Sequence, residues 1–222
     1  MKEHLLNLSN FLMVQKVCEI ALRDSEFFGV IGDTGSGKSV ALEHFKNQNH
    51  DVVKLIRVKP TMGMTDFFLE LGALFGYRGS KKSKFIISNY LKEYCNSVEQ
   101  QELLLLDEAA RFRPHQLTFI QEIRDITQSK LGIVISGPHD FVRKLIKWDE
   151  KEIMGVAEFK RRVQLFKRMR PLEKKEIIAV CKEYGITERK IILQKFIKHD
   201  NIGLLTRAIK NYLKYGKDLG EI

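Results

Sequence analysis

Gly32-Asp33-Thr34-Gly35-Ser36-Gly37-Lys38-Ser39 is the stretch that decides the fold of this 222-residue chain. It fits the pattern G-x-x-x-x-G-K-[ST], whose glycines let backbone N–H groups turn toward phosphate oxygens. An apolar stretch at 27–31 predicts a strand before it, and apolar residues recur at helical spacing after it. The sequence therefore predicts a phosphate-binding loop between a strand and a helix.

Each residue type in this loop has a role in holding a nucleotide. A triphosphate would lie at the positive end of the following helix. Lys38 would reach the β- and γ-phosphates, and Ser39 would ligate Mg²⁺. The predicted nucleotide contacts are Gly32, Asp33, Thr34, Gly35, Ser36, Gly37, Lys38, Ser39 and Val40.

A second motif begins at Leu103, where four leucines precede Asp107 and Glu108. By periodicity alone, this run could be a core helix with a solvated end. Paired with the loop, it predicts a buried parallel strand that delivers carboxylates to its C-terminal edge, the Walker B pattern. Asp107 would then hold Mg²⁺, and Glu108 would orient the attacking water. We expect ATP and Mg²⁺ as cofactors, and slow ATP hydrolysis.

Positive charge is concentrated near the C-terminus. The chain has 38 basic and 28 acidic residues, and from Glu158 onward there are 17 basic against 8 acidic residues. This asymmetry favours a polyanionic partner such as nucleic acid, because neutralised phosphates release counterions. The alternative is a solvated basic helical surface without a partner.

Composition indicates the cellular setting. The sequence shows no long apolar span and no signal-peptide pattern at its N-terminus. Cys18, Cys95 and Cys181 lie far apart without C-x-x-C spacing, which indicates reduced thiols and no zinc site. We expect a cytoplasmic protein that does not act at a membrane.

Apolar strands alternate with helical patterns along the chain, which predicts an α/β fold with a parallel sheet and helices on both faces. We expect an ATPase domain over residues 1–170, with an N-terminal helix within 1–26. A change to purely helical periodicity after Pro171 predicts a small all-helical lid domain over 171–222. The expected strands are 27–31, 52–58, 103–106, 132–136 and 163–168, and the expected helices of the first domain are 65–75, 84–95, 114–128 and 139–147.

The order of these parts resembles the AAA+ ATPases, a class of P-loop NTPases, and more narrowly the DNA-transposition regulators of the phage Mu B type. Besides the two motifs, the resemblance rests on Ile133 to Gly137, Phe159 to Val163 and Gly203 to Arg207. It implies that Ser136 is the polar sensor after Walker B. It also implies that Arg162 or the neighbouring Arg161 is an arginine finger, which reaches the nucleotide of the next subunit in an oligomer.

The lid motif, Gly203-Leu204-Leu205-Thr206-Arg207, has extra spacing before its arginine compared with the family's glycine-asparagine-leucine-arginine. The resemblance assigns Arg207 as the second sensor and as a nucleotide contact. It also implies that basic residues in loops between the two Walker motifs line a DNA channel. The candidates are Lys59, Thr61, Arg78, Lys81, Lys82 and Lys84.

Small flexible residues separate the cations at 78–84. This pattern suits sequence-independent contact with a phosphate backbone. It suits equally an exposed loop that has no partner. We expect an ATPase that oligomerises on duplex DNA as a ring or filament and activates a transposase. The alternatives are a helicase-loader-like or secretion-associated ATPase acting on protein, a non-catalytic DNA-binding module, and a small-molecule kinase.

Overall fold

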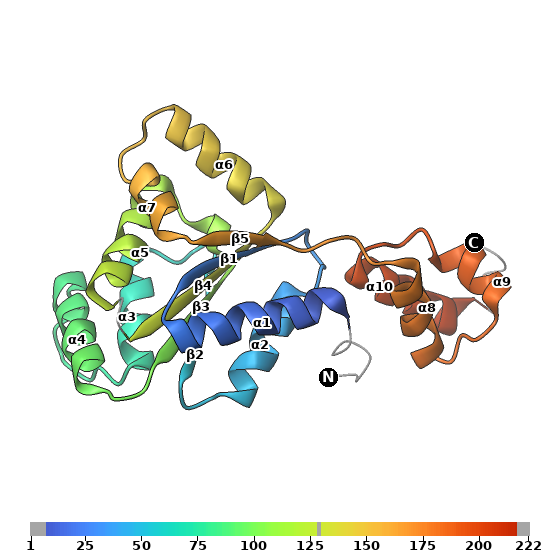
Figure 1. Ribbon diagram of the computed structural model, residues 1–222, viewed down its shortest axis with the longest axis horizontal. Coiled ribbons are helices and arrows are strands. Elements are labelled where there is room, and N and C mark those ends of the chain that lie inside the picture. Colours follow the sequence, from blue (N-terminus) through green and yellow to red (C-terminus); the bar gives the residue numbers. More distant parts are fainter. Residues whose placement is uncertain (1–7, 128–129, 217–222) are drawn as a thin grey trace.

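A computed structural model describes residues 8–127 and 130–216 of the chain (Figure 1). Strands are separated by one or two helices up to residue 168, and the described residues after it form only helical elements and the segments that connect them. In chain order the elements are α1 (Ser9–Asp24), β1 (Phe27–Ile31), α2 (Lys38–Gln48), β2 (Val53–Arg57), α3 (Met64–Leu74), α4 (Lys84–Ser97), β3 (Glu102–Asp107), the 3₁₀ turn η2 (Ala109–Arg111), α5 (Pro114–Thr127), β4 (Leu131–Gly137), α6 (His139–Glu150), α7 (Val156–Arg162), β5 (Leu165–Arg168), α8 (Lys174–Glu183), α9 (Arg189–Ile191), the π-helical turn η3 (Ile192–Phe196) and α10 (Ile202–Tyr215).

The described strands form one five-stranded sheet in the order β2-β3-β4-β1-β5, and every neighbouring pair is parallel. Their carboxyl ends therefore lie at the same edge of the sheet. The register aligns Arg57 with Asp107 and Val30 with Ser136. This edge collects the residues that follow β1, β3 and β4, where open α/β sheets bind ligands.

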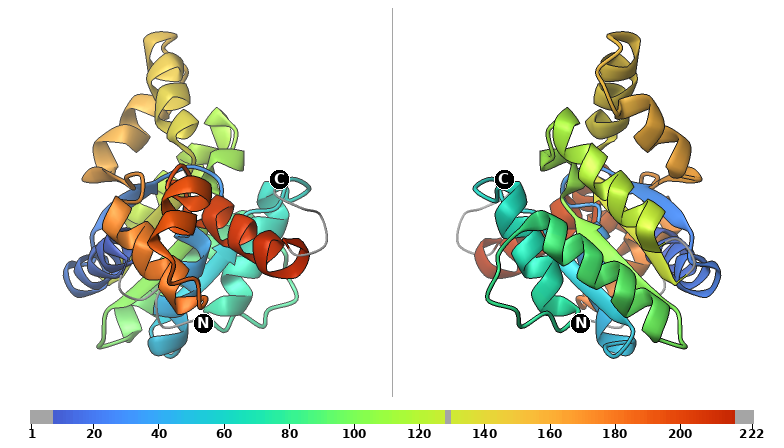
Figure 2. Two further views of the ribbon diagram at one scale, coloured as in Figure 1. Left: turned by 90° about the vertical axis from the view of Figure 1, so that its right-hand side faces the viewer. Right: turned by 90° about the vertical axis from the view of Figure 1, so that its left-hand side faces the viewer.

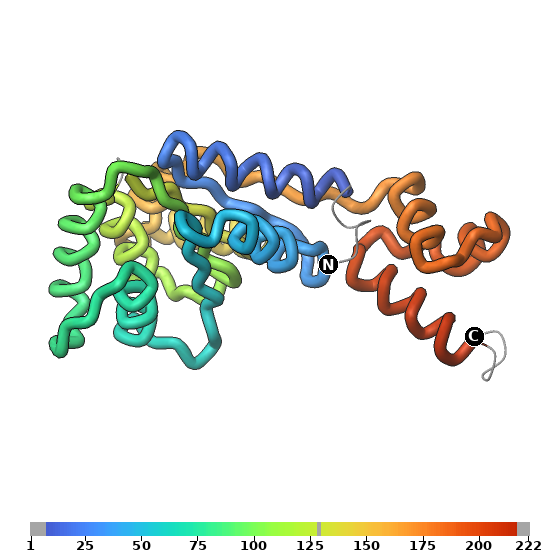
Figure 3. The backbone as a smooth tube through the Cα atoms, turned by 90° about the horizontal axis from the view of Figure 1, so that it is seen from below, coloured from blue at the N-terminus to red at the C-terminus, as the bar shows by residue number. Residues whose placement is uncertain are grey.

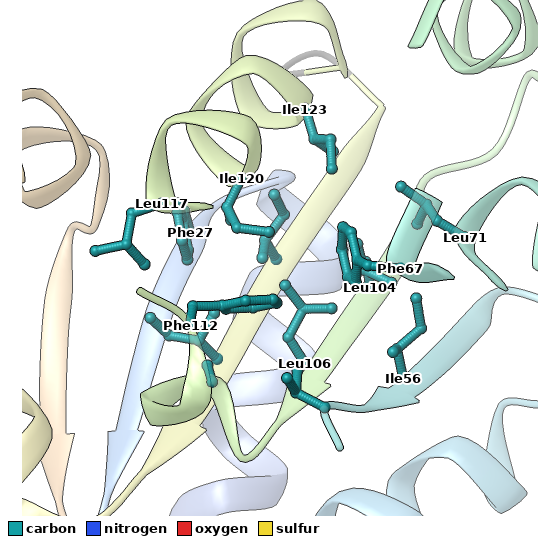
Figure 4. Packing of buried hydrophobic residues seen from close by; sticks show 14 of the residues in the cluster. Phe27, Ile56, Phe67, Leu71, Leu104, Leu106, Phe112, Leu117, Ile120 and Ile123 are labelled. Carbon is teal, nitrogen blue, oxygen red and sulfur yellow. The ribbon is translucent and has the colours of Figure 1, made fainter. Parts of the chain in front are cut away.

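Helices cover both faces of the sheet. Successive residues of a strand point to opposite faces, so one strand contributes side chains to two separate clusters. Leu104 and Leu106 of β3 belong to one buried cluster with α3, α4, α5 and α7 (Figure 4). Leu103 and Leu105 belong to a second cluster with α1 and α2, which lie on the other face (Figure 3). All six residues of β3 are buried, as expected for a central strand.

The C-terminal helices continue the second cluster. Met169 and Leu172, in the segment after β5, are buried together with Ile177 of α8 and Leu205 of α10. Asn10 of α1 fixes the same segment, because its amide donates to the Arg170 carbonyl at 2.7 Å and accepts from the Arg170 N–H at 3.0 Å. The predicted fold class is confirmed, and the division at residue 170 stays a prediction.

The expected elements differ from the structure mainly between β4 and β5. The expected loop around 148–155 is shorter, since α6 continues to Glu150. Helix α7 was not expected, because seven residues are too few for helical periodicity to be recognised, and β5 consequently begins at Leu165. Helix α5 is described as far as Thr127, so its expected end at Gln128 lies outside the described residues. No helix in the described ranges is long and apolar enough to cross a membrane.

Candidate nucleotide-binding site

The loop at 32–39 encloses its own lysine. Gly37 precedes α2 with a φ of 97°, a left-handed conformation that glycine adopts at little cost. Lys38 begins α2 and is only 8% exposed, and its ammonium donates to the carbonyls of Gly32 at 2.6 Å and Asp33 at 2.9 Å. Burial lowers the pKa of Lys38, while Asp107, Glu108 and Asp33 act against that shift. The loop therefore holds a cation close to two carboxylates.

Asp107, at the end of β3, is 1% exposed and makes several polar contacts. Its Oδ1 accepts the hydroxyl of the fully buried Ser136 and the backbone N–H of Glu108 at 3.0 Å. Its Oδ2 lies 3.2 Å from Nε of Arg57 on the neighbouring strand. Arg57 was not among the site residues predicted from the sequence, although its register opposite Asp107 follows from strand pairing.

Glu108 lies in a different backbone conformation from Asp107. Its φ of 61° is in the left-handed region, which is uncommon for residues other than glycine and is concentrated at functional sites. Its Oε2 lies 3.4 Å from Nε of Arg111, and its side chain is 39% exposed. The turn after β3 thus buries one carboxylate and leaves the next accessible to solvent.

A pocket of about 300 Å³ lies beside the loop. One side is formed by residues 34–40 and Glu108, which the sequence predicted. The lining also includes apolar residues that were not predicted, because they come from α1 and the residue before it, the segment after β5 and α10, far apart in the sequence. These residues are Leu8, Phe11, Met169, Leu172 and Ile202.

The N-terminus of α10 contacts the phosphate-binding loop. The Asn201 side chain accepts from the N–H groups of Gly203 and Leu204 and donates to the Thr34 carbonyl at 3.1 Å. The Gly203 N–H also donates to the Gly35 carbonyl at 2.9 Å. Arg207 is exposed on the same helix and is not among the described residues that line the pocket. Asn201 was not predicted; its position as an N-cap before the lid motif was the available signal.

The two finger candidates at the end of α7 have different environments. Arg162 forms a two-pronged ion pair with Asp125 of α5, with N···O distances of 2.5 and 2.6 Å. Arg161 is 74% exposed, and its contact with Glu158 is 3.7 Å long. Arg162 is therefore paired within its own chain, whereas the Arg161 side chain is exposed to solvent.

The DNA candidates lie on two loops. Lys59 and Thr61 are exposed just after β2, at the carboxyl edge of the sheet. Residues 78–82 form an exposed loop between α3 and α4, where the Tyr77 hydroxyl donates to the Lys81 carbonyl at 2.8 Å. Lys84 differs from the others, since its ammonium lies 4.5 Å from the centre of the Phe119 ring and its side chain is partly buried.

The oxygen groups at the site suit a hard cation such as Mg²⁺, which prefers carboxylate, hydroxyl and phosphate oxygens. Asp107 and Ser39 supply a carboxylate and a hydroxyl, and each carboxylate oxygen can accept a further contact. Within the described ranges, no group of three or more acidic, histidine or cysteine side chains is arranged so that it could hold a metal ion.

The parallel sheet, the enclosed lysine and the buried aspartate define a P-loop NTPase. A family model for the AAA domain matches residues 22–145, from the end of α1 into α6. The chain belongs to the AAA domain family. A comparison with curated proteins found no match.

Solved structures show the same fold at low sequence identity. Cdc6p from Pyrobaculum aerophilum has a TM-score of 0.66 and 18% identity over 94% of this chain and 61% of its own. The Orc1 protein of Aeropyrum pernix, solved in complex with DNA, has a TM-score of 0.59 and 15% identity over 95% of this chain and 59% of its own. A chain of Drosophila ORC bound to DNA has a TM-score of 0.51 and 11% identity over 75% of this chain and 94% of its own.

The chain spans about three fifths of the length of the two archaeal proteins. At these identities the likeness is one of fold. The AAA part of the expected family is thereby confirmed, while the comparisons contain nothing specific to transposition regulators.

Proposed function

We propose that the protein binds and hydrolyses ATP with Mg²⁺. The observation that carries this proposal is the pocket beside the phosphate-binding loop, whose lining combines Lys38 and Glu108 with apolar side chains of distant segments. Phosphates need the N–H groups and the cation on one side, and a purine base needs the apolar surface on the other. The pocket supplies both.

Each residue of the site would have a separate role in ATP hydrolysis. Lys38 would exchange the loop carbonyls for the β- and γ-phosphate oxygens, and Ser39 and Asp107 would hold Mg²⁺, which neutralises charge on the phosphates. Ser136 orients Asp107 by its hydrogen bond. Glu108, accessible in the pocket lining, would accept a proton from water aligned with the γ-phosphate.

We further propose that the ATP-bound protein assembles on duplex DNA without sequence preference and activates a transposase. The exposed cations at 59 and 78–82 support DNA contact, and two of the structurally similar proteins were solved with DNA. The exposed Arg161 supports a contact with the nucleotide of a neighbouring subunit. The transposase rests on the sequence resemblance.

A second candidate keeps the ATPase but assigns it a protein partner, as in a helicase loader. The fold shared with Cdc6p and Orc1 is the same under both candidates. The two candidates differ in what stimulates hydrolysis. Duplex DNA alone would raise turnover under the first, whereas the second requires a protein partner.

Two substitutions test the proposed function. Lys38→Ala should abolish ATP-dependent DNA binding, because the phosphates lose their cation. Glu108→Gln should retain ATP binding but lower turnover by about a hundredfold or more, the usual contribution of a general base, and lengthen the lifetime on DNA. Turnover and DNA dissociation are measured with a fluorescent ATP analogue and labelled duplex. Equal DNA affinity of the unmodified protein with and without ATP would refute ATP-controlled assembly.

A further inference from the structure

The apolar residues of the nucleotide pocket come from three segments that are far apart in the sequence. We call them the apolar wall: Leu8, Phe11, Met169, Leu172 and Ile202. No single helix or strand sets their positions relative to one another. The contacts that join the start of α1 to the segment 169–172 and to α8 therefore decide the shape of this end of the pocket.

Asn10 joins α1 to the segment after β5. It is buried, and it lies in the pocket lining. Its side-chain amide donates to the Arg170 carbonyl and accepts from the Arg170 N–H. Only a side chain that both donates and accepts can make this pair, and a carboxylate of the same size cannot. The pair holds the first turn of α1 beside the segment 169–172.

Glu176 of α8 makes the second connection, and it is also buried. Its Oε2 accepts the Glu173 N–H at 2.8 Å, in the capping box that begins α8. Its Oε1 accepts the N–H of Ser9, the first residue of α1, at 2.9 Å. The N-cap residue of α1 is Leu8, which has no side-chain oxygen, so Glu176 supplies the acceptor that α1 lacks. One carboxylate thus caps two helices.

The charge of Glu176 suits this position. Burial acts to raise the pKa of Glu176, but the N–H groups of Glu173 and Ser9 and the Arg170 guanidinium outweigh burial and lower the pKa. Nη2 of Arg170 lies 3.8 Å from Oε1 of Glu176. The dipole of each helix also favours a negative charge at its N-terminus. The ionised carboxylate can therefore accept from both helices.

We propose that Asn10 and Glu176 are positioning residues for the nucleoside end of the bound nucleotide. We call their hydrogen bonds the clasp. The start of α1 points toward the C-terminal helices (Figure 1), which lie in front of the sheet in the left view of Figure 2. The closed clasp keeps the apolar wall in the geometry that receives the base. This inference rests on the proposed function, because it assigns how the same pocket holds the base.

A purely structural role is the alternative for these two residues. Buried polar groups that satisfy each other stabilise a fold wherever they lie. Loss of a clasp hydrogen bond would then weaken the binding of every ligand alike. A ligand without a base distinguishes the two roles, because it does not meet the apolar wall. None of the clasp hydrogen bonds involves the loop at 32–39, which would bind the phosphates.

The first experiment compares ATP with tripolyphosphate, both with Mg²⁺, by isothermal titration calorimetry. Asn10→Asp removes the donor to the Arg170 carbonyl, and Glu176→Gln places an NH₂ group against a backbone N–H. Both substitutions keep the size of the side chain. Each should weaken ATP binding by about tenfold, the loss expected when the pocket has its binding geometry about a tenth of the time, and change tripolyphosphate affinity by less than about twofold.

Matched controls make the same chemical changes at exposed positions. Asn89→Asp on α4 and Glu183→Gln on α8 should bind ATP as the unmodified chain does. Lys38→Ala should weaken the binding of both ligands, because it acts on the phosphates. Equal weakening of ATP and tripolyphosphate binding in the Asn10 and Glu176 variants would overturn the inference, as would unchanged ATP binding.

The second experiment observes the clasp by hydrogen exchange and mass spectrometry, without nucleotide. In Glu176→Gln the amides of residues 9–11 should exchange on the order of tenfold faster, because the start of α1 loses its cap. Ser9 lies 167 positions from Glu176 in the sequence, so a local effect of the substitution cannot cause this change. Exchange in the loop at 32–39 should stay the same. An unchanged rate at residues 9–11 would show that Glu176 does not hold α1 and would overturn the inference.

The outcomes separate this inference from the proposed function. Absence of ATP binding by the unmodified chain would overturn the proposed function, and the inference with it. ATP binding by the unmodified chain that both clasp variants retain in full would overturn the inference alone.

Discussion

At the scale of single residues, Arg57 is the unexpected member of the site. It lies 3.2 Å from the aspartate that would hold Mg²⁺ and is itself 53% exposed. A cation at this position stabilises the buried carboxylate, and it would compete with a bound Mg²⁺ for Oδ2. It also lies two residues before Lys59, so the predicted metal site and a candidate DNA loop are adjacent along the chain.

We predict that Arg57→Ala lowers the Mg²⁺ concentration needed for half-maximal ATP hydrolysis. The pair is partly exposed and contributes roughly 1 kcal/mol or less, so the expected shift is at most about fivefold. Arg57→Lys should give an intermediate value, because the charge remains but the geometry changes. A magnesium titration of turnover measures the effect. A higher Mg²⁺ requirement in Arg57→Ala would show that Arg57 orients Asp107 for the metal and does not compete with it.

The neighbouring arginines of α7 are predicted to have different roles. Arg162→Ala should lower the free energy of unfolding, by up to about 1 kcal/mol, because Asp125 loses a partly exposed partner. Arg161→Ala should leave stability unchanged and lower turnover of the DNA-assembled protein, on the order of a thousandfold, if it acts as the finger. Urea unfolding and DNA-stimulated turnover distinguish them. A loss of assembled turnover in Arg162→Ala, with Arg161→Ala unaffected, would reverse the assignment.

At the scale of elements, the lid meets the phosphate-binding loop through the first turn of α10. The backbone of Gly203 approaches Gly35 so closely that an added Cβ would lie 2.9 Å from the Gly35 carbonyl oxygen and 3.0 Å from its Cα. Both of these are backbone atoms, which cannot move aside as a side chain can. The position therefore couples the placement of α10 to the shape of the loop.

We predict that Gly203→Ala weakens nucleotide binding by about tenfold, because α10 must move away from the loop and from the apolar wall that includes Ile202. The free energy of unfolding should change little. The cost of moving α10 is offset by the higher helix propensity of alanine, which favours the helix by roughly 1 kcal/mol over glycine. Leu204→Ala is the matched control, because Leu204 is 55% exposed on the same turn. Titration with a fluorescent ATP analogue measures the dissociation constant. Unchanged affinity in Gly203→Ala would mean that the lid contact does not support the bound nucleotide.

The same elements show what the sequence can predict. Strand β1 was predicted with its observed bounds and β3 within one residue at each end, because buried parallel strands are continuous apolar runs next to recognisable motifs. The loop and both carboxylates followed from local patterns. Helix α7 was too short to show a period, and the apolar wall is assembled from α1, the segment after β5 and α10. Those contacts depend on how distant segments pack, which no local pattern specifies.

At the scale of the whole molecule, charge and fold point to different DNA surfaces. The basic surplus lies after residue 157, where residues 158–170 hold six basic residues against one acidic residue and residues 171–222 hold eleven against seven, whereas the candidate DNA loops lie between the two Walker motifs. The loop at 78–82 connects two helices on one face of the sheet, and the cluster formed with α1 and α2 lies on the other face. A measurement that counts phosphate contacts can separate these surfaces.

We predict that Lys81→Ala with Lys82→Ala reduces the slope of log affinity against log salt by about two, since each phosphate contact on duplex DNA contributes about 0.9. The loss should be similar for unrelated DNA sequences, because phosphate contacts carry no base information. Lys16→Ala with Lys46→Ala, on α1 and α2, removes the same charge from the opposite face and should leave the slope unchanged. Fluorescence anisotropy with ATP at several salt concentrations gives the slopes. If the loop variant keeps the full slope, its lysines do not contact the duplex, and the basic residues after residue 157 become the candidate surface for DNA.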